Sequence, residues 1–379
     1  MKTNSKIAKR TFWTVAAFYF IIAFEFFYMA SPFAAYFYSV YKPGLSFLNE
    51  FPAISWLTGF FLPHIVESTN SSFLNSVKIA GASFAAAGLL VFLVCAIQVY
   101  YAKIFKRGAV TGGLYKFIRH PQYTAFAVCS FGLLLLWPRY LVLIMFITLL
   151  FAYYLLAKAE EKECSRKFGK DYDDYLKRTN RFIPFKIQVL DRLTKLYNNR
   201  IEKVVFISLL YVLCIVSSLL ISKGFKKISV NNLHTVYKDH NVSISVLKKS
   251  PAEIEDAILI AENNPKIKRL ISNRQKTDKL ITYLLPADMY ISEIPMERPE
   301  NATSHVFNNT YESNKYKLIY TIANFKNETI VKSGNDILMN ALSTTPLLEV
   351  WIDLSRKQLI KITPLKGTQR YENIPEPIF

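Results

Sequence analysis

RHPQYTAFAVCSFGLLLLWPRYLVLIMFITLLFAYYLLAKAEE, residues 119–161, decides the fold class of this chain. Two uncharged apolar runs, 121–138 and 140–157, are separated only by Arg139. About 20 apolar residues are needed for a helix to cross a bilayer. The pair therefore predicts a tight hairpin of two membrane helices, and Trp137 and Tyr140 in the turn are typical of the membrane–water interface.

Three further stretches are apolar and long enough to cross a bilayer, at 12–30, 79–102 and 204–222. The first contains one acid, Glu25, which we expect to face the bundle interior because a charge is costly in lipid. The shorter stretch 54–66 is broken by Gly59 and Pro63, so we interpret it as an interfacial or re-entrant segment. The predicted fold is a multi-span α-helical membrane protein with about five transmembrane helices, and no cleavable signal peptide is expected.

Positive charges predict the orientation of these helices. The N-terminal arm, the loop 103–120 and the segment 158–203 carry 22 Lys and Arg, against 3 in 31–78 and the hairpin turn. Because Lys and Arg favour the cytoplasmic side, the N-terminus, the loop and segment 158–203 should all be cytoplasmic. The net charge of +19 is thus mainly a topology signal, so the expected partner is the lipid bilayer and not nucleic acid.

The rest of the chain differs in composition from these spans. Hydrophobic residues make up 51% of the sequence, yet the mean hydropathy is only +0.18, so a polar part dilutes the apolar one. We expect a membrane domain at 1–222 and a soluble α+β tail at 223–379, placed on the outer face by five spans. In the tail, Ser250, Pro251 and Glu253 predict a capped helix start. Strands are predicted at 279–285 and 317–325, with a hairpin across 347–363.

Residues able to bind a ligand gather at the cytoplasmic ends of the hairpin. Proline is favoured at the first position of a helix, so Pro121 should begin the helix, with Arg119 and His120 just before it. A helix N-terminus beside such residues suits a carboxylate or phosphate. At the other end of the hairpin, Glu160 and Glu161 should lie at the same membrane level, and one of them should point into the bundle because adjacent side chains diverge by about 100°. Interfacial anchoring and a solvated charged face are the alternative interpretations.

No metal site is predicted, because the four cysteines are scattered and form no CxxC pair. A short surface helix should follow Gly169, with Tyr172 and Tyr175 on one face, and it is interpreted either as an amphipathic interfacial helix or as a lid.

The ordered motifs from residue 108 to residue 186 resemble the isoprenylcysteine carboxyl methyltransferase superfamily, which includes phospholipid methyltransferases and bacterial membrane thiol methyltransferases. They comprise Gly113, Tyr115, the run Arg119 to Tyr123, the apolar hairpin, Glu160-Glu161, Phe168-Gly169, Tyr172, Tyr175 and the run Arg181 to Pro184. Three positions depart from the family pattern: Ala125 where glycine is usual, Cys164 where an apolar residue is usual, and Asn180 where proline is common.

The resemblance implies a membrane enzyme that uses S-adenosyl-L-methionine. On this basis the cofactor pocket consists of Tyr115, His120, Pro121, Tyr123, Glu160 and Glu161. The residues implied near the reacting groups, our catalytic candidates, are Arg119, Arg178 and Arg181. No metal or covalent intermediate is needed, since methyl transfer is an in-line displacement that depends on holding donor and acceptor aligned.

Two hypotheses for function remain open at this point. The first is a cofactor-dependent methyltransferase acting on a prenylcysteine carboxylate, a thiol or a lipid amine, in the cytoplasmic membrane of a bacterium or the endoplasmic reticulum of a eukaryote. The second is a membrane sensor or assembly factor that works through its tail, with a methyltransferase-like core that has lost its activity. The sequence does not indicate the oligomeric state.

Overall fold

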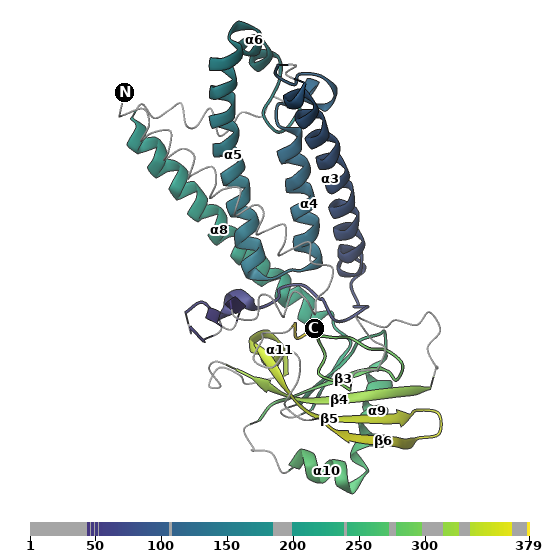
Figure 1. Ribbon diagram of the computed structural model, residues 1–379. Helices are drawn as coiled ribbons and strands as arrows, with labels where there is room; N and C mark the ends of the chain where they lie inside the picture. Colours follow the sequence, from purple (N-terminus) through teal and green to yellow (C-terminus); the bar gives the residue numbers. More distant parts are fainter. Residues whose placement is uncertain are drawn as a thin grey trace. The chain divides into compact units, whose positions relative to one another are not determined.

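The structure is a computed structural model that describes residues 44–45, 47–48, 50–51, 53–105, 108–184, 199–238, 241–272, 278–297, 314–325, 334–365 and 377–379. The chain divides into two compact units. Most of the apolar helices belong to the first unit, and the second unit contains a six-stranded sheet (Figure 1).

The described apolar helices cover the predicted spans, and α3, α5 and α8 extend beyond theirs. They are α3 (Ser72–Ile104), α4 (Pro121–Leu136), α5 (Tyr140–Phe168), α6 (Lys170–Arg178) and α8 (Arg200–Asn231). Three of them, α3, α5 and α8, are long and apolar enough to cross a membrane, whereas α4 is apolar but shorter, with 16 residues. The span expected at 12–30 lies outside the described residues, so five spans stay a prediction.

Glycines bring α3 and α4 close together. A Cβ on Gly132 would lie 2.3 Å from the backbone nitrogen of Ala85, and a Cβ on Gly88 would lie 2.4 Å from that of Cys129. Such small residues let two membrane helices approach at their backbones, which gains van der Waals packing where the hydrophobic effect contributes little. On its other side α4 packs against α5 through an apolar cluster that includes Phe126, Leu149 and Leu156.

The hairpin turn is held by the segment that the sequence predicted to be interfacial or re-entrant. This segment contains a short 3₁₀ helix, η1 (Ser55–Thr58), and no spanning helix. The backbone N–H of Tyr140 donates to the carbonyl of Gly59 over 3.1 Å. Arg139 is 1% exposed, donates from Nη1 to the carbonyl of Thr58 over 2.7 Å, and lies 4.4 Å above the ring of Phe60. Arg139 is therefore buried and bonded to the segment that holds the turn.

The second unit confirms a sheet in the C-terminal part of the chain. The strands, in spatial order, are β1 (Thr235–Lys238), β2 (Asn241–Ser245), β3 (Leu280–Pro286), β4 (Lys315–Asn324), β5 (Ser343–Asp353) and β6 (Gln358–Pro364). All neighbours are antiparallel except β2 and β3, which are parallel and are connected through α9 (Pro251–Glu262) and α10 (Pro265–Ser272). A further helix, α11 (Gly334–Asn340), precedes β5. Strands β1 and β2 and helices α10 and α11 were not predicted, because they are short.

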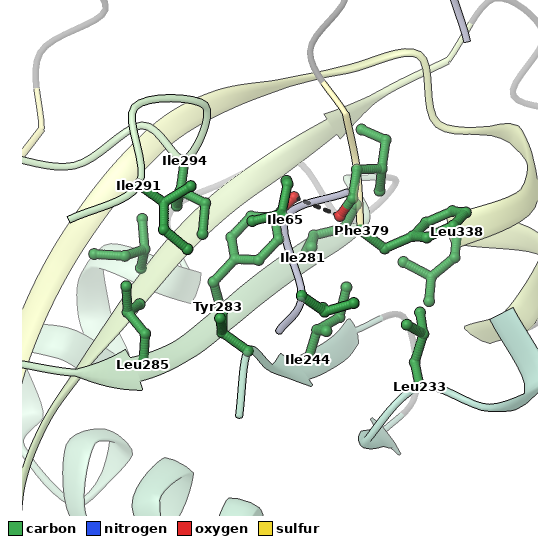
Figure 2. Packing of buried hydrophobic residues seen from close by; sticks show 14 of the residues in the cluster. Ile65, Leu233, Ile244, Ile281, Tyr283, Leu285, Ile291, Ile294, Leu338 and Phe379 are labelled. Atoms are coloured by element: carbon green, nitrogen blue, oxygen red, sulfur yellow. Dashed lines mark hydrogen bonds between the residues drawn. The ribbon is translucent and has the colours of Figure 1, made fainter. Parts of the chain in front are cut away.

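Two apolar cores cover the two faces of this sheet. Along β3, Ile281 and Tyr283 belong to one core, whereas Leu280 and Leu284 belong to the other, as the alternation of a strand requires. The first core also contains Phe379, which is 2% exposed (Figure 2). In that core the hydroxyl of Tyr283 donates to the carbonyl of Ile378 over 3.1 Å. The predicted helix start at Ser250 is confirmed, with both hydrogen bonds of its capping box present.

Candidate functional site

The first turn of α4 is fixed by a segment that lies far away in the sequence. Pro121 is the first residue of the helix and His120 is its N-cap. The backbone N–H of Arg119 donates to the carbonyl of Asn180 over 2.8 Å, and that of His120 donates to the carbonyl of Arg181 over 3.0 Å. Residues 179–184, which we call the strap, therefore lie directly against the start of α4.

The two adjacent glutamates of α5 point in different directions, as their positions on a helix predict. Glu161 points inward, with 9% of its side chain exposed, and accepts a hydrogen bond from Arg119 Nε over 2.7 Å. Arg181 donates to both of its oxygens, from Nε over 3.0 Å and from Nη2 over 2.7 Å. Charge-assisted and bidentate bonds of this kind are the strongest that side chains form. Glu161 therefore joins α5 both to the start of α4 and to the strap.

Glu160 is more accessible than Glu161, with 35% of its side chain exposed. The hydroxyl of Tyr123 donates to its Oε1 over 2.6 Å, and His120 Nδ1 lies 3.5 Å from its Oε2. This carboxylate thus has one close donor and an open side, which makes it the better of the two candidates to accept a hydrogen bond from a ligand.

His120 lies between the two glutamates and is 5% exposed. Its Nε2 lies 3.4 Å from Oε1 of Glu161 but has no hydrogen-bond partner among the described residues. Its ring is stacked on that of Tyr123, with centroids 5.3 Å apart and planes 4° apart, and Tyr123 is stacked in turn on Tyr153 at 4.6 Å. A buried polar atom without a partner is uncommon in proteins and marks a place where a ligand or a water can bind.

Arg119 also fixes the end of α6. Its Nη1 donates to the carbonyl of Leu176 over 2.8 Å and to that of Thr179 over 2.6 Å. The last carbonyls of a helix have no partner within the helix, so a guanidinium is well suited to satisfy them. Arg119 therefore links the start of α4, the carboxylate of Glu161 and the end of α6.

Tyr115 lies before α4 and, among the described residues, makes no hydrogen bond to either glutamate. It belongs to a 3₁₀ helix, η2 (Gly113–Lys116), and its hydroxyl donates to the side-chain oxygen of Gln122. Its carbonyl accepts a hydrogen bond from the hydroxyl of Tyr175 over 2.6 Å. Burial raises the pKa of Tyr175 to about 12, so this phenol stays protonated and keeps donating at neutral pH. Tyr115 therefore supports the loop before α4 and lies within electrostatic range of Glu160.

Arg178 is also not brought to the cluster. It is exposed on α6, and its Nε donates to the carbonyl of Asp174 over 3.3 Å. Of the three arginines, Arg119 and Arg181 thus contact Glu161, whereas Arg178 bonds to its own helix.

Two aromatic residues of the site were missed from the sequence. Tyr153 is stacked on Tyr123, and the ring of Tyr154 lies 5.4 Å from the guanidinium carbon of Arg181. The sequence contained a signal for both residues. Tyr153 precedes Glu160 by seven residues and Tyr154 precedes Glu161 by seven, so each tyrosine lies on the same face of the helix as its glutamate. Within the described part of the chain, no group of His, Cys, Asp or Glu is placed to hold a metal ion.

The comparison with protein families agrees with this geometry. The family model described as phospholipid methyltransferase matches residues 78–171, about a quarter of the chain. The matched segment contains α4, both glutamates and His120, and the match confirms the family resemblance seen in the motifs. No curated protein and no solved structure matches the chain significantly. Together with the apolar helices, the family match supports a membrane methyltransferase in general.

Proposed function

We propose that the chain is an integral-membrane methyltransferase that uses S-adenosyl-L-methionine and acts on a lipophilic or small acceptor. The observation that carries the proposal is the cluster of His120, Tyr123 and Glu160 at the ends of α4 and α5. The bonds of Glu161 to Arg119 and Arg181 form the frame that holds this cluster in place. This cluster lies inside the segment that matches the methyltransferase family. We propose further that residues 1–222 form the membrane domain, with about five spans and cytoplasmic site residues, and that the tail 223–379 lies on the outer face.

The residues present fit the proposed cofactor. Glu160 offers a partly exposed carboxylate, which suits a ribose hydroxyl or a positive sulfonium. His120 offers a buried Nε2 without a partner, and the stacked rings of Tyr123 and Tyr153 offer aromatic faces that attract a cation. Pro121 begins α4, so the free N–H groups of the helix start and its partial positive charge suit the cofactor's carboxylate.

When bound, S-adenosyl-L-methionine would supply the methyl group of its sulfonium, and the neutral thioether S-adenosylhomocysteine would be the leaving group. The protein would contribute alignment, because holding donor and acceptor close removes much of the entropic part of the barrier. Glu161 already bonds to both Arg119 and Arg181, so we assign these three residues a positioning role: they hold α4, α5 and the strap at fixed distances.

Binding of the cofactor tests the pocket. We expect saturable binding of S-adenosyl-L-methionine to the purified full chain in detergent, and at least a tenfold loss of affinity in His120→Ala and in Glu160→Gln. Glu163→Gln is the matched control, since Glu163 lies on the same helix and, within the described ranges, pairs only with the exposed Arg166. Unchanged affinity in both site variants would show that the pocket is wrong.

The acceptor is tested by product analysis. Membranes containing the protein are incubated with cofactor labelled in the methyl group, and the label is then sought in lipid, protein and volatile fractions. Label in lipid indicates a lipid amine, base-labile label in protein indicates a prenylcysteine carboxylate, and volatile label indicates a thiol. Absence of label from all three fractions would contradict the proposed activity.

A second function is favoured by the size of the C-terminal sheet, which lies outside the matched segment. A sensor or assembly factor would work through this part of the chain. Removing residues 223–379 distinguishes the two proposals. Retained methyl transfer supports the enzyme, whereas retained cofactor binding with loss of the cellular phenotype supports the sensor.

A further inference from the structure

A buried histidine lies where α8 meets the sheet. Helix α8 ends at Asn231 and strand β1 begins at Thr235, with His234 directly before the strand. The residue is 7% exposed, and its Nε2 is buried without a hydrogen-bond partner among the described residues. Such an atom is uncommon in proteins, so its place at this junction calls for a physical reason.

The residues beside His234 hold this junction together. Leu233 is 4% exposed and belongs to the first core of the sheet, as does Ile244 on β2 (Figure 2). The carbonyl of His234 accepts a hydrogen bond from the backbone N–H of Ser245 over 2.9 Å. Beyond it, β1 pairs with β2 over four residues only and lies at the edge of the described sheet. A short pairing at an edge is held by few bonds, so it belongs to the part of a fold that opens first.

The surroundings of His234 favour its neutral form. A neutral imidazole has an N–H at one ring nitrogen only, whereas a protonated imidazole has an N–H at both. Protonation would therefore leave a charged donor at Nε2 without an acceptor, and Lys248, in the loop after β2, adds a second positive charge nearby. Burial and then Lys248 lower the pKa of His234 from its ordinary value of 6.5.

Within the described part of the chain, no carboxylate offsets a charge on His234. Lys248 is the one charged group there that acts electrostatically on the imidazole. Glu253, on α9, bonds to Lys249 and Ser250 instead. The other charged side chains on the elements that pack around the junction are Glu67 before α3, Lys226 on α8, Glu255 and Asp256 on α9, and Asp336 on α11.

We propose that His234 makes the junction between α8 and the sheet open in acid. Above pH 6.5 the imidazole is neutral whether the junction is closed or open, so the closed form keeps its full stability. Below that value the open form takes up a proton more readily, and the stability of the closed form falls until the pH reaches the lower pKa of the closed form. This response does not depend on methyl transfer, and it would suit a sheet unit that acts as a sensor.

The first experiment measures the titration of His234. The full chain in detergent micelles is labelled with a stable carbon isotope in its histidine rings, and the magnetic resonance signal of His234 is assigned by its loss in His234→Asn. We expect a pKa below 6.5 that moves toward 6.5 in Lys248→Gln, because that variant removes a like charge. A pKa at or above 6.5 in the wild type would overturn the proposal.

The second experiment measures the opening itself. Amide hydrogen exchange of residues 232–238 and 241–246 in the full chain is compared at about pH 7.5 and about pH 5.5, after correction for the intrinsic effect of pH on exchange. In acid these residues should lose protection relative to β4 and β5. The loss is limited to a factor of about ten for each unit by which the pKa of the closed form lies below 6.5.

Histidine variants show whether this loss comes from His234. His234→Asn cannot titrate, so its protection should not depend on pH, whereas His64→Asn, in the same unit, should keep the response of the wild type. Equal pH dependence in the wild type and in His234→Asn would overturn the proposal. Should His234→Asn fail to fold, Lys248→Gln decides, because it should reduce the loss in acid and an unchanged loss would contradict the proposed cause.

Discussion

Replacing Glu161 with glutamine should loosen the frame of the site more than any other single substitution. The carboxylate is shared by Arg119 and Arg181, and the exposed fractions of the three side chains are 9%, 8% and 13%. Glutamine keeps the shape but removes the charge, so two guanidinium groups would face each other around a neutral amide. Removing one partner of a buried ion pair costs about 3–5 kcal/mol, because the remaining charge stays desolvated.

This loss should appear as local opening of α6 and the strap, which Arg119 and Arg181 hold. Since each 1.4 kcal/mol is about a factor of ten, the opening equilibrium should rise by roughly a hundredfold or more. Amide hydrogen exchange of residues 170–184 in the full chain, in detergent micelles, measures this equilibrium directly.

Glu163→Gln is the control for this measurement. Glu163 pairs with Arg166 on the same helix, but the two side chains are 61% and 78% exposed. An exposed pair contributes about 0–1 kcal/mol, so exchange in the same segment should change little. Equal exchange in the two variants would refute the reasoning. In a double-mutant cycle, Arg181→Gln should cost less in the Glu161→Gln background than in the wild type, because the shared interaction is already lost.

Gly132→Ala should lower the midpoint of thermal unfolding and cost about 1–3 kcal/mol of stability, because the new Cβ would meet the α3 backbone. Gly224→Ala should raise the midpoint slightly, because a Cβ at that position would meet nothing within 4 Å and alanine favours a helix over glycine. Phe379→Ala should destabilise the sheet unit by about 3–5 kcal/mol, measured as loss of exchange protection in β3, since the ring is 2% exposed. The pKa of Glu253 is lowered from 4.5 to about 2, chiefly by hydrogen bonds from Lys249 and Ser250. Its folded pKa is depressed, so its stabilising contribution is present above pH 4.5 and is lost as the pH falls toward about 2. The difference in unfolding midpoint between wild type and Glu253→Gln should shrink over that interval, and a difference independent of pH would contradict this assignment.

Local sequence signals predicted the features that depend on neighbouring residues. The apolar run before Arg139 predicted the hairpin, and Pro121 and Gly169 predicted where helices begin and end. The capping residues Ser250 and Glu253 predicted the start of α9. In each case the physical cause lies within a few residues, because proline, glycine and capping side chains act on the backbone beside them.

Long-range contacts could not be predicted in the same way. The resemblance placed Tyr115 in the cofactor pocket, but the sequence did not show that its carbonyl would accept a hydrogen bond from Tyr175, 60 residues later. The sequence showed Arg139 only as the charge between the two apolar runs, whereas in the structure Arg139 is buried and bonds to η1, about 80 residues earlier. Partners of this kind depend on how distant segments of the chain pack together, and the residues next to each position do not predict that packing.

For this protein the sequence by itself determined the apolar hairpin, the basic loop and the adjacent glutamates, because hydropathy and helix geometry are local properties. Only the tertiary structure decided which glutamate faces Arg119 and Arg181 and which one remains accessible beside Tyr123. The reason is that two adjacent carboxylates on a helix differ only in the direction in which they point. The partners found in each direction depend on how α4, α5 and the strap pack together.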